Sequence, residues 1–141
     1  FDGEYEANVD AIKTSNDAWL QETVNRHGWF TIDEHGSEAD FGAFLIVQHS
    51  ENVAFQREVL AMLKPLAKDG QSAASNFALL YDRVQVRDGK SQVYATQGRC
   101  NDEGLWAPLA LQNRDEVDGL RADVGLEPLS AYQERMTSKY C

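Results

Sequence analysis

The chain contains few cysteines, few basic residues and no long apolar run, and each shortage excludes a class of protein. Its longest apolar run, residues 41–47, is far shorter than the roughly 20 residues that a membrane-spanning helix needs. Only 13 Lys and Arg stand against 23 Asp and Glu, which gives a net charge of −10. A chain of this charge repels phosphate backbones and anionic lipids, so we expect neither nucleic acid nor membrane as a partner.

The common catalytic and cofactor motifs are also missing. The sequence has no Gly-x-Ser-x-Gly elbow, no Walker loop and no dinucleotide fingerprint. Its three histidines, at positions 27, 35 and 49, lack His-x-x-x-His spacing, and its two cysteines lack Cys-x-x-Cys spacing. We therefore expect no metal and no cofactor. Ser50, beside His49, is the local alternative for a nucleophile.

The length of 141 residues, 43% of them hydrophobic, predicts a single globular domain over residues 1–141. Cys100 and Cys141 could close a disulfide loop of about 40 residues, or both could remain free thiols. The sequence begins at Phe1, with neither Met nor a signal-peptide pattern. We expect a protein that is secreted or periplasmic after processing, with the disulfide formed; a cytoplasmic location is the alternative.

Apolar spacing predicts a mainly α fold. The expected helices cover residues 5–26, with a break near 14–17, then 37–48, 53–68, a helix from Ser72 or Ser75 to Arg83, 114–124 and 129–139. Residues 29–32 read as an extended connection. The helix that contains residues 43–49 is apolar around most of its circumference, so we expect it to be central and buried.

One β-hairpin is expected at the side of these helices. Residues 84–86 alternate between apolar and polar, residues 92–96 form a second extended run, and Asp88-Gly89 between them is a common hairpin turn. The predicted fold thus has five or six helices around a central buried helix, with one β-hairpin packed at the side.

Several short blocks occur in a fixed order along the chain. They are NRHGWFTI (25–32), AFLIVQH (43–49), FQ (55–56), NFALLYDRV (76–84), QVYATQ (92–97) and VGLEPLSAY (124–132). Together they resemble a family of small bacterial proteins of unknown function that carries YGWP, LIVQHAD, LTDRV and YGTQ blocks. The resemblance spans roughly residues 17–133, and it implies a shared, mainly helical fold without implying a reaction.

Two positions depart from that family pattern. Phe30 replaces the proline of Gly-Trp-Pro, which frees an amide donor. Ala95 replaces the glycine of Tyr-Gly-Thr-Gln, and from this we expect an ordinary strand conformation at position 95. These departures predict a pocket reshaped relative to the family.

His49 is the strongest candidate for chemistry. It ends an almost entirely apolar helix, and an imidazole there could act as a general base. Asp82 could orient that imidazole, as a carboxylate fixes a histidine tautomer. In the alternative interpretation, His49 is a core histidine bonded to a backbone carbonyl, and Asp82 and Arg83 tie their helix end to the hairpin.

Polar side chains near these two residues are the candidate binding groups. They are Gln48, Arg83, Tyr94, Thr96 and Gln97. If residues 92–96 form a strand, Tyr94 and Thr96 share one face of it. That face could bind a ligand, or it could equally be a solvated surface.

These residues lead to two functional hypotheses. The first is a small acid–base enzyme or binding protein for a small polar organic molecule, with His49 as base and chemistry such as cyclisation, isomerisation or hydrolysis. The second is a non-enzymatic, acidic interaction or inhibitor-like domain that binds a basic protein partner. A cavity beside His49 would favour the first hypothesis, and an exposed acidic patch the second.

Overall fold

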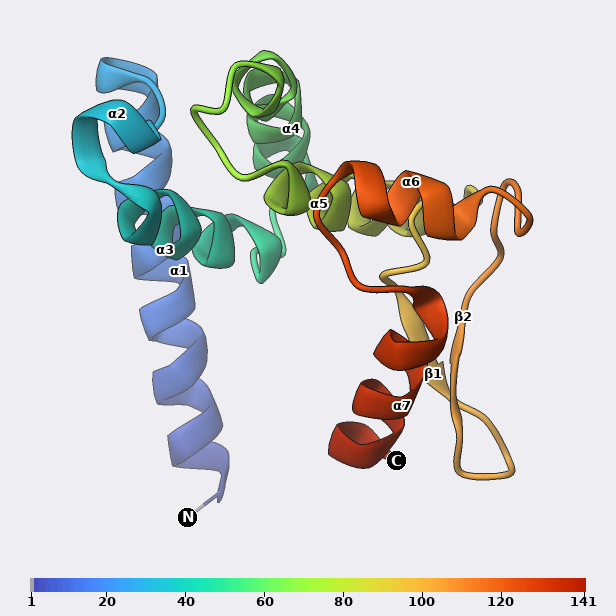
Figure 1. The fold of residues 1–141 in the computed structure, drawn as a ribbon. Coiled ribbons are helices and arrows are strands. Elements are labelled where there is room, and N and C mark those ends of the chain that lie inside the picture. Colours follow the sequence, from blue (N-terminus) through green and yellow to red (C-terminus); the bar gives the residue numbers. More distant parts are fainter. Residues whose placement is uncertain (1) are drawn as a thin grey trace. The chain divides into compact units, whose positions relative to one another are not determined.

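The structure, a computed structural model, describes the backbone of residues 2–141 and the side chains of residues 6–141. Seven helices and two short strands occur in this part of the chain (Figure 1). In order they are α1 (Asp2–His27), α2 (Ile32–His35), α3 (Ser37–Gln48), α4 (Val53–Lys68), α5 (Ala74–Arg87), β1 (Gly98–Cys100), β2 (Trp106–Pro108), α6 (Val117–Asp123) and α7 (Leu129–Tyr140). The mainly α prediction with one β-hairpin is confirmed.

The chain forms two compact units, Phe1–Ala73 and Ala74–Cys141. The first holds α1 to α4, and the second holds α5, the hairpin, α6 and α7. The expectation of a single domain over residues 1–141 stays a prediction. Among residues 2–141, no helix is both long and apolar enough to cross a membrane.

In the first unit, α3 contacts α1, α2 and α4, which is the central position expected of residues 43–49 within that unit (Figure 1). Its buried residues include Ala43, Phe44 and Val47. One local expectation was wrong, and a second failed only at its last residue. The predicted break near residues 14–17 is absent, because α1 continues to His27 and the Thr14 hydroxyl donates to the Asp10 carbonyl, 2.9 Å away, within the helix. The connection expected to be extended over 29–32 is non-helical at residues 29–31, with Thr31 extended, and Ile32 begins the short helix α2, which raises the helix count above six.

A buried carboxylate fixes the end of the first unit. Asp40, on α3, is 1% exposed. It accepts hydrogen bonds from Trp29 Nε1 at 2.7 Å, from Ser72 Oγ at 2.6 Å and from the Ala73 amide at 3.0 Å. One side chain thus holds two irregular segments against α3.

The second unit places its hairpin elsewhere than predicted. Residues 84–87 continue α5, and the hairpin pairs Gly98 with Pro108, Arg99 with Ala107 and Cys100 with Trp106. The Asp88-Gly89 pair ends the helix instead of turning a hairpin. Gly89 has φ of 71°, its amide donates to the Val86 carbonyl, and the amide of Lys90 donates to the Gln85 carbonyl. This is a Schellman helix end, which uses glycine for the same left-handed conformation that a hairpin turn requires.

Asp82 organises the segment between α5 and β1. It is fully buried and accepts hydrogen bonds from the amides of Val93 (2.9 Å), Tyr94 (3.1 Å) and Thr96 (3.0 Å), and from the Thr96 hydroxyl (2.9 Å). Within that segment, Ala95 has φ of 55°, so the ordinary strand conformation expected there is wrong. The left-handed residue allows its neighbours' amides to converge on one carboxylate.

Gln92 satisfies further backbone hydrogen-bonding groups in and beside this segment. Its side-chain amide donates to the Gln97 carbonyl (2.7 Å) and the Leu109 carbonyl (3.1 Å), and its Oε1 accepts from the Gln97 amide (2.9 Å). Side chains therefore satisfy backbone groups that a strand ladder would otherwise pair.

The core of the second unit lies between the hairpin, α6 and α7. Its buried members are Ala95, Trp106, Val117, Leu129 and Tyr132. The Trp106 and Tyr132 rings meet edge to face at 5.2 Å, and a Cβ added at Gly98 would lie 2.3 Å from the Trp106 ring. Position 98 must therefore be glycine for the indole to pack on the strand.

A disulfide joins Cys100, at the end of β1, to Cys141, directly after α7. It links positions 41 residues apart, and α7 also contacts β2 (Figure 1). The disulfide suggested by the sequence is present.

Replacing Asp82 by Ala should lower the free energy of unfolding by at least about 2 kcal/mol, because three amides, one of them buried, and a hydroxyl lose their acceptor. Urea denaturation followed by circular dichroism measures the loss. Asp123→Ala, an exposed site at the end of α6, is the matched control and should change it by less than about 0.5 kcal/mol. Equal effects of the two substitutions would contradict the anchoring role of Asp82.

Removing the disulfide through the double substitution Cys100→Ser and Cys141→Ser should lower the unfolding free energy by up to about 4 kcal/mol, the loop-entropy value for this separation. Thermal melts with and without a thiol reductant test this. The wild type should melt at a lower temperature under reductant, and the double variant should be insensitive to it. A wild type indifferent to reductant would contradict the prediction.

Candidate functional site

The predicted site residues lie in both units. Gln48 and His49 end α3 in the first unit. The others belong to the second unit: Asp82 and Arg83 on α5, then Tyr94, Thr96 and Gln97 in the segment before β1. The pairing of His49 with Asp82 stays a prediction, and both oxygens of Asp82 accept hydrogen bonds from residues 93–96.

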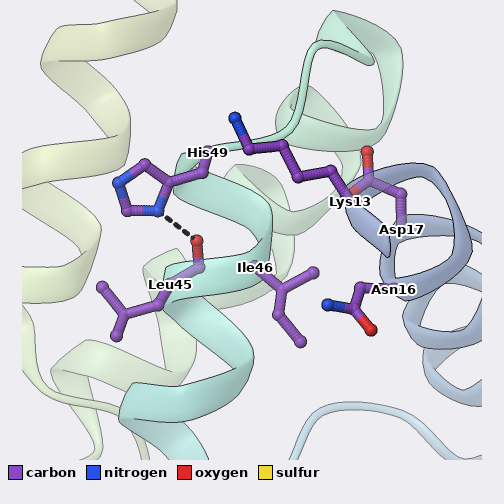
Figure 2. A pocket seen from close by; sticks show the side chains of 6 residues that line it. All are labelled: Lys13, Asn16, Asp17, Leu45, Ile46 and His49. Atoms are coloured by element: carbon purple, nitrogen blue, oxygen red, sulfur yellow. Dashed lines mark hydrogen bonds between the residues drawn. The ribbon is translucent and has the colours of Figure 1, made fainter. Parts of the chain in front are cut away.

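His49 borders a pocket of about 200 Å³. The other lining side chains are Lys13, Asn16 and Asp17 from α1 and Leu45 and Ile46 from α3, as Figure 2 shows. The imidazole is exposed, and its Nδ1 lies 2.8 Å from the Leu45 carbonyl oxygen. A carbonyl only accepts, so Nδ1 carries the proton and Nε2 of the neutral ring keeps the lone pair.

Ser50, the alternative nucleophile, has a structural role. Its buried hydroxyl donates to Asp17 Oδ2 at 2.5 Å and accepts from the Asn52 amide at 3.1 Å. Asp17 thus binds Ser50. Gln48 is buried, with 6% of its surface exposed, and its backbone carbonyl accepts a hydrogen bond from Gln56 Nε2. Of the predicted residues in this unit, His49 is the one that borders the pocket.

In the second unit, four predicted residues form one hydrogen-bonded chain. Arg83 Nε donates to Gln97 Oε1 at 3.1 Å, Gln97 Nε2 donates to Thr96 Oγ1 at 3.1 Å, and Thr96 Oγ1 donates to Asp82 Oδ2 at 2.9 Å. Adjacent residues on a helix lie about 100° apart, so Asp82 faces the buried segment while Arg83 reaches it through Gln97. These hydrogen bonds fix the position of the Arg83 guanidinium.

Three of these residues line a second pocket, of about 350 Å³, which we call the arginine pocket. Its lining residues are Arg83, Thr96, Gln97, Gly98, Arg99, Cys100, Trp106, Met136 and Tyr140. Two arginines and no acidic side chain line it, although the chain carries a net charge of −10. Burial lowers the pKa of Arg83, and the nearby Arg87 lowers it further.

Tyr94 lies beside Tyr81, with the two rings edge to face at 6.3 Å. Burial raises the pKa of its phenol, and Asp82 adds to the rise. Its carbonyl accepts a hydrogen bond from Arg121 Nη1 at 2.8 Å. The structure therefore gives the backbone of Tyr94 a clear structural role.

Sequence reasoning missed Arg121, which is fully buried on α6. Its Nε donates to the Glu127 carbonyl at 2.6 Å, and its guanidinium lies 4.7 Å from the centre of the Tyr132 ring. The sequence did carry a signal for its burial, because Arg121 lies four residues after the buried Val117 and so on the same face of α6. Arg99, Met136 and Tyr140 were also missed as lining residues, because only the hairpin and disulfide bring them to Arg83.

Among residues 6–141, whose side chains the structure describes, no group of three or more His, Cys, Asp or Glu side chains could hold a metal ion. The fold and its pockets define a small, mainly helical protein of two compact units, the second closed by a disulfide.

The chain belongs to a family of unknown function, DUF6624, whose family model matches residues 2–141. This match confirms the resemblance to a family of unknown function. Comparisons with curated proteins and with solved structures give no match.

The pH dependence of stability tests the burial of Asp82. Burial raises its pKa in the folded protein above the ordinary value of 3.8, and hydrogen bonds from Val93, Thr96 and Tyr94 oppose that rise. The folded state therefore keeps the proton where the unfolded chain has lost it. The contribution of Asp82 to the unfolding free energy is largest below the unfolded-state pKa and falls as pH rises through the folded-state pKa.

Urea denaturation of the wild type and of Asp82→Asn from about pH 3.5 to 7 isolates this contribution, because the two proteins share every other titrating group. The free energy of unfolding of the wild type minus that of the variant should fall as pH rises. A difference that grows with pH would mean that the hydrogen bonds outweigh the burial.

Proposed function

We propose that this protein binds a small polar organic molecule in the arginine pocket. The observation that carries the proposal is the Arg83 guanidinium, half-buried in a pocket of about 350 Å³ and held by Gln97. Pockets of this size with a few convergent polar groups are typical of small-molecule sites.

The charge of the pocket supports this proposal. Guanidinium groups bind anionic or strongly polar ligand groups through charge-assisted hydrogen bonds. The lining supplies two guanidinium groups and no carboxylate, in a chain whose formal charge is −10. A polar ligand would therefore find its best electrostatic partner here.

A second candidate function is acid–base chemistry at His49. The observation that favours it is the hydrogen bond between Nδ1 and the Leu45 carbonyl, which leaves Nε2 as the basic nitrogen in a pocket shared with Lys13 and Asp17. This arrangement needs no cofactor. The proposed reaction is a proton transfer on a small polar molecule, with His49 as the base.

A location outside the cytoplasm fits the same proposal. The Cys100–Cys141 disulfide stabilises the second unit, and Cys100 lines the arginine pocket. Disulfides persist in oxidising compartments and are rare in the cytosol. We therefore propose that the pocket works in a secreted or periplasmic protein.

A thermal-shift screen of a metabolite library tests both candidates, because a ligand that binds only the folded state raises its melting temperature. Wild type, Arg83→Gln and His49→Ala are screened in parallel, and each variant is the control for the other site. Hits that vanish in Arg83→Gln and persist in His49→Ala support the arginine pocket. The reverse pattern supports His49.

Hits indifferent to both substitutions, or no hits at all, would contradict small-molecule binding at either pocket. They would favour the non-enzymatic hypothesis, in which the acidic surface binds a basic protein partner.

A further inference from the structure

We infer that the ligand of the arginine pocket is a small monocarboxylate with an apolar, ring-sized body. Its carboxylate lies at Arg83 and Arg99, and its body lies against Trp106, Met136 and Tyr140. This inference rests on the proposed function and names the class of ligand.

The polar end of the pocket is built for a planar anion. A guanidinium presents its N–H groups in a flat fork that matches the two oxygens of a carboxylate. The orientation of the Arg83 fork is set by its Nε bond to Gln97, and through Thr96 by the buried carboxylate of Asp82. Because the fork is fixed before the ligand arrives, binding loses little side-chain entropy.

The charge of the whole chain limits the charge of the ligand. Two arginines supply local attraction, yet the formal charge of −10 repels every further negative charge that a ligand brings. A ligand with a single carboxylate gains the attraction of the two arginines and meets the smallest repulsion from the net charge of the chain. Phosphate groups, which carry more charge at neutral pH, are disfavoured by the same field.

The remaining wall requires an apolar body. Met136 and Tyr140 present a thioether and a phenol, Trp106 adds the small part of its indole that the core leaves exposed, and aromatic rings pack well against such groups. An anion without an apolar group would leave these side chains in contact with water. Burial of their apolar surface would then contribute nothing to binding.

Packing and the disulfide restrain two parts of this wall. The Trp106 indole packs against Gly98, where a Cβ would lie 2.3 Å from the ring, and meets the Tyr132 ring at 5.2 Å. Tyr140 precedes Cys141, which the disulfide ties to Cys100 on β1. The indole is therefore held by its packing, and the disulfide holds the backbone beside Tyr140, a residue that is 60% exposed.

Isothermal titration calorimetry with a matched set of probes tests the inference. The probes are benzoate, phenylacetate and indole-3-acetate, the carboxamide of each, acetate, phenyl phosphate and inorganic phosphate. At least one aromatic carboxylate should bind, with its carboxamide and acetate each weaker by about tenfold or more, because the carboxamide lacks the charge and acetate lacks the body. Phenyl phosphate and inorganic phosphate should also bind more weakly.

Two arginine variants locate the binding. Arg83→Gln should weaken the best carboxylate by about tenfold or more. Arg114→Gln removes the same charge from an exposed position outside the pocket and should change the affinity less than about twofold. Circular dichroism and the melting temperature confirm that both variants fold.

Each outcome is decisive. Equal binding of a carboxylate and its carboxamide, tighter binding of either phosphate, or equal losses in the two arginine variants would overturn the inference. If no carboxylate binds while library compounds still bind in an Arg83-dependent way, the inference fails and the proposed function stands. If no compound of any class depends on Arg83, both fail.

Discussion

A buried carboxylate that accepts hydrogen bonds from backbone amides is the interaction on which the second unit depends. Apart from an isolated bridge between Gln92 and Leu111, residues 91–97 form no strand ladder, so most of their amides need other acceptors. Asp82 accepts three of these amides and a hydroxyl, while Gln92 pairs further groups of the same segment and its surroundings. The first unit uses the same solution, since Asp40 accepts from Trp29, Ser72 and Ala73. In each unit, a helix holds irregular chain through one aspartate.

This arrangement links the core of the second unit to the candidate site. Asp82 and Arg83 are neighbours on α5, and the helical rotation between them directs the first into the core and the second to Gln97. The pocket wall formed by Thr96 and Gln97 belongs to the segment that Asp82 holds. The geometry of the arginine pocket is therefore set by the core rather than by a mobile surface loop.

Much of the helical fold could be predicted from periodicity. The bounds predicted for the helices at 37–48, 53–68 and 129–139 lie within a residue of those observed, because each has a regular apolar face and clear end signals. The hairpin could not be placed in this way. Asp88-Gly89 suits a helix end as well as a turn, and the strands at 98–100 and 106–108 are three residues long, with no alternating pattern.

The site was predictable only in part. Arg83, Thr96 and Gln97 were predicted as binding groups from their residue types, and the structure places all three on the lining of one pocket. The chain of hydrogen bonds that joins them to Asp82 has no local sequence signal, because its donors and acceptors are up to 14 residues apart and irregular. Arg121 was missed because arginine is rarely buried, although its position four residues after Val117 places it on the apolar face of α6.

The left-handed Ala95 gives the segment around Asp82 a particular character. Amides on both sides of it converge on one point, which is how backbone cradles bind free anions in other proteins. Here the bound group is the carboxylate of Asp82. Because the polypeptide links it to the segment that binds it, its effective concentration exceeds that of a dissolved anion in ordinary solution. The segment is a cradle of amides occupied by the carboxyl group of its own helix, which leaves Arg83 and Arg99 as the cationic groups that line the neighbouring pocket.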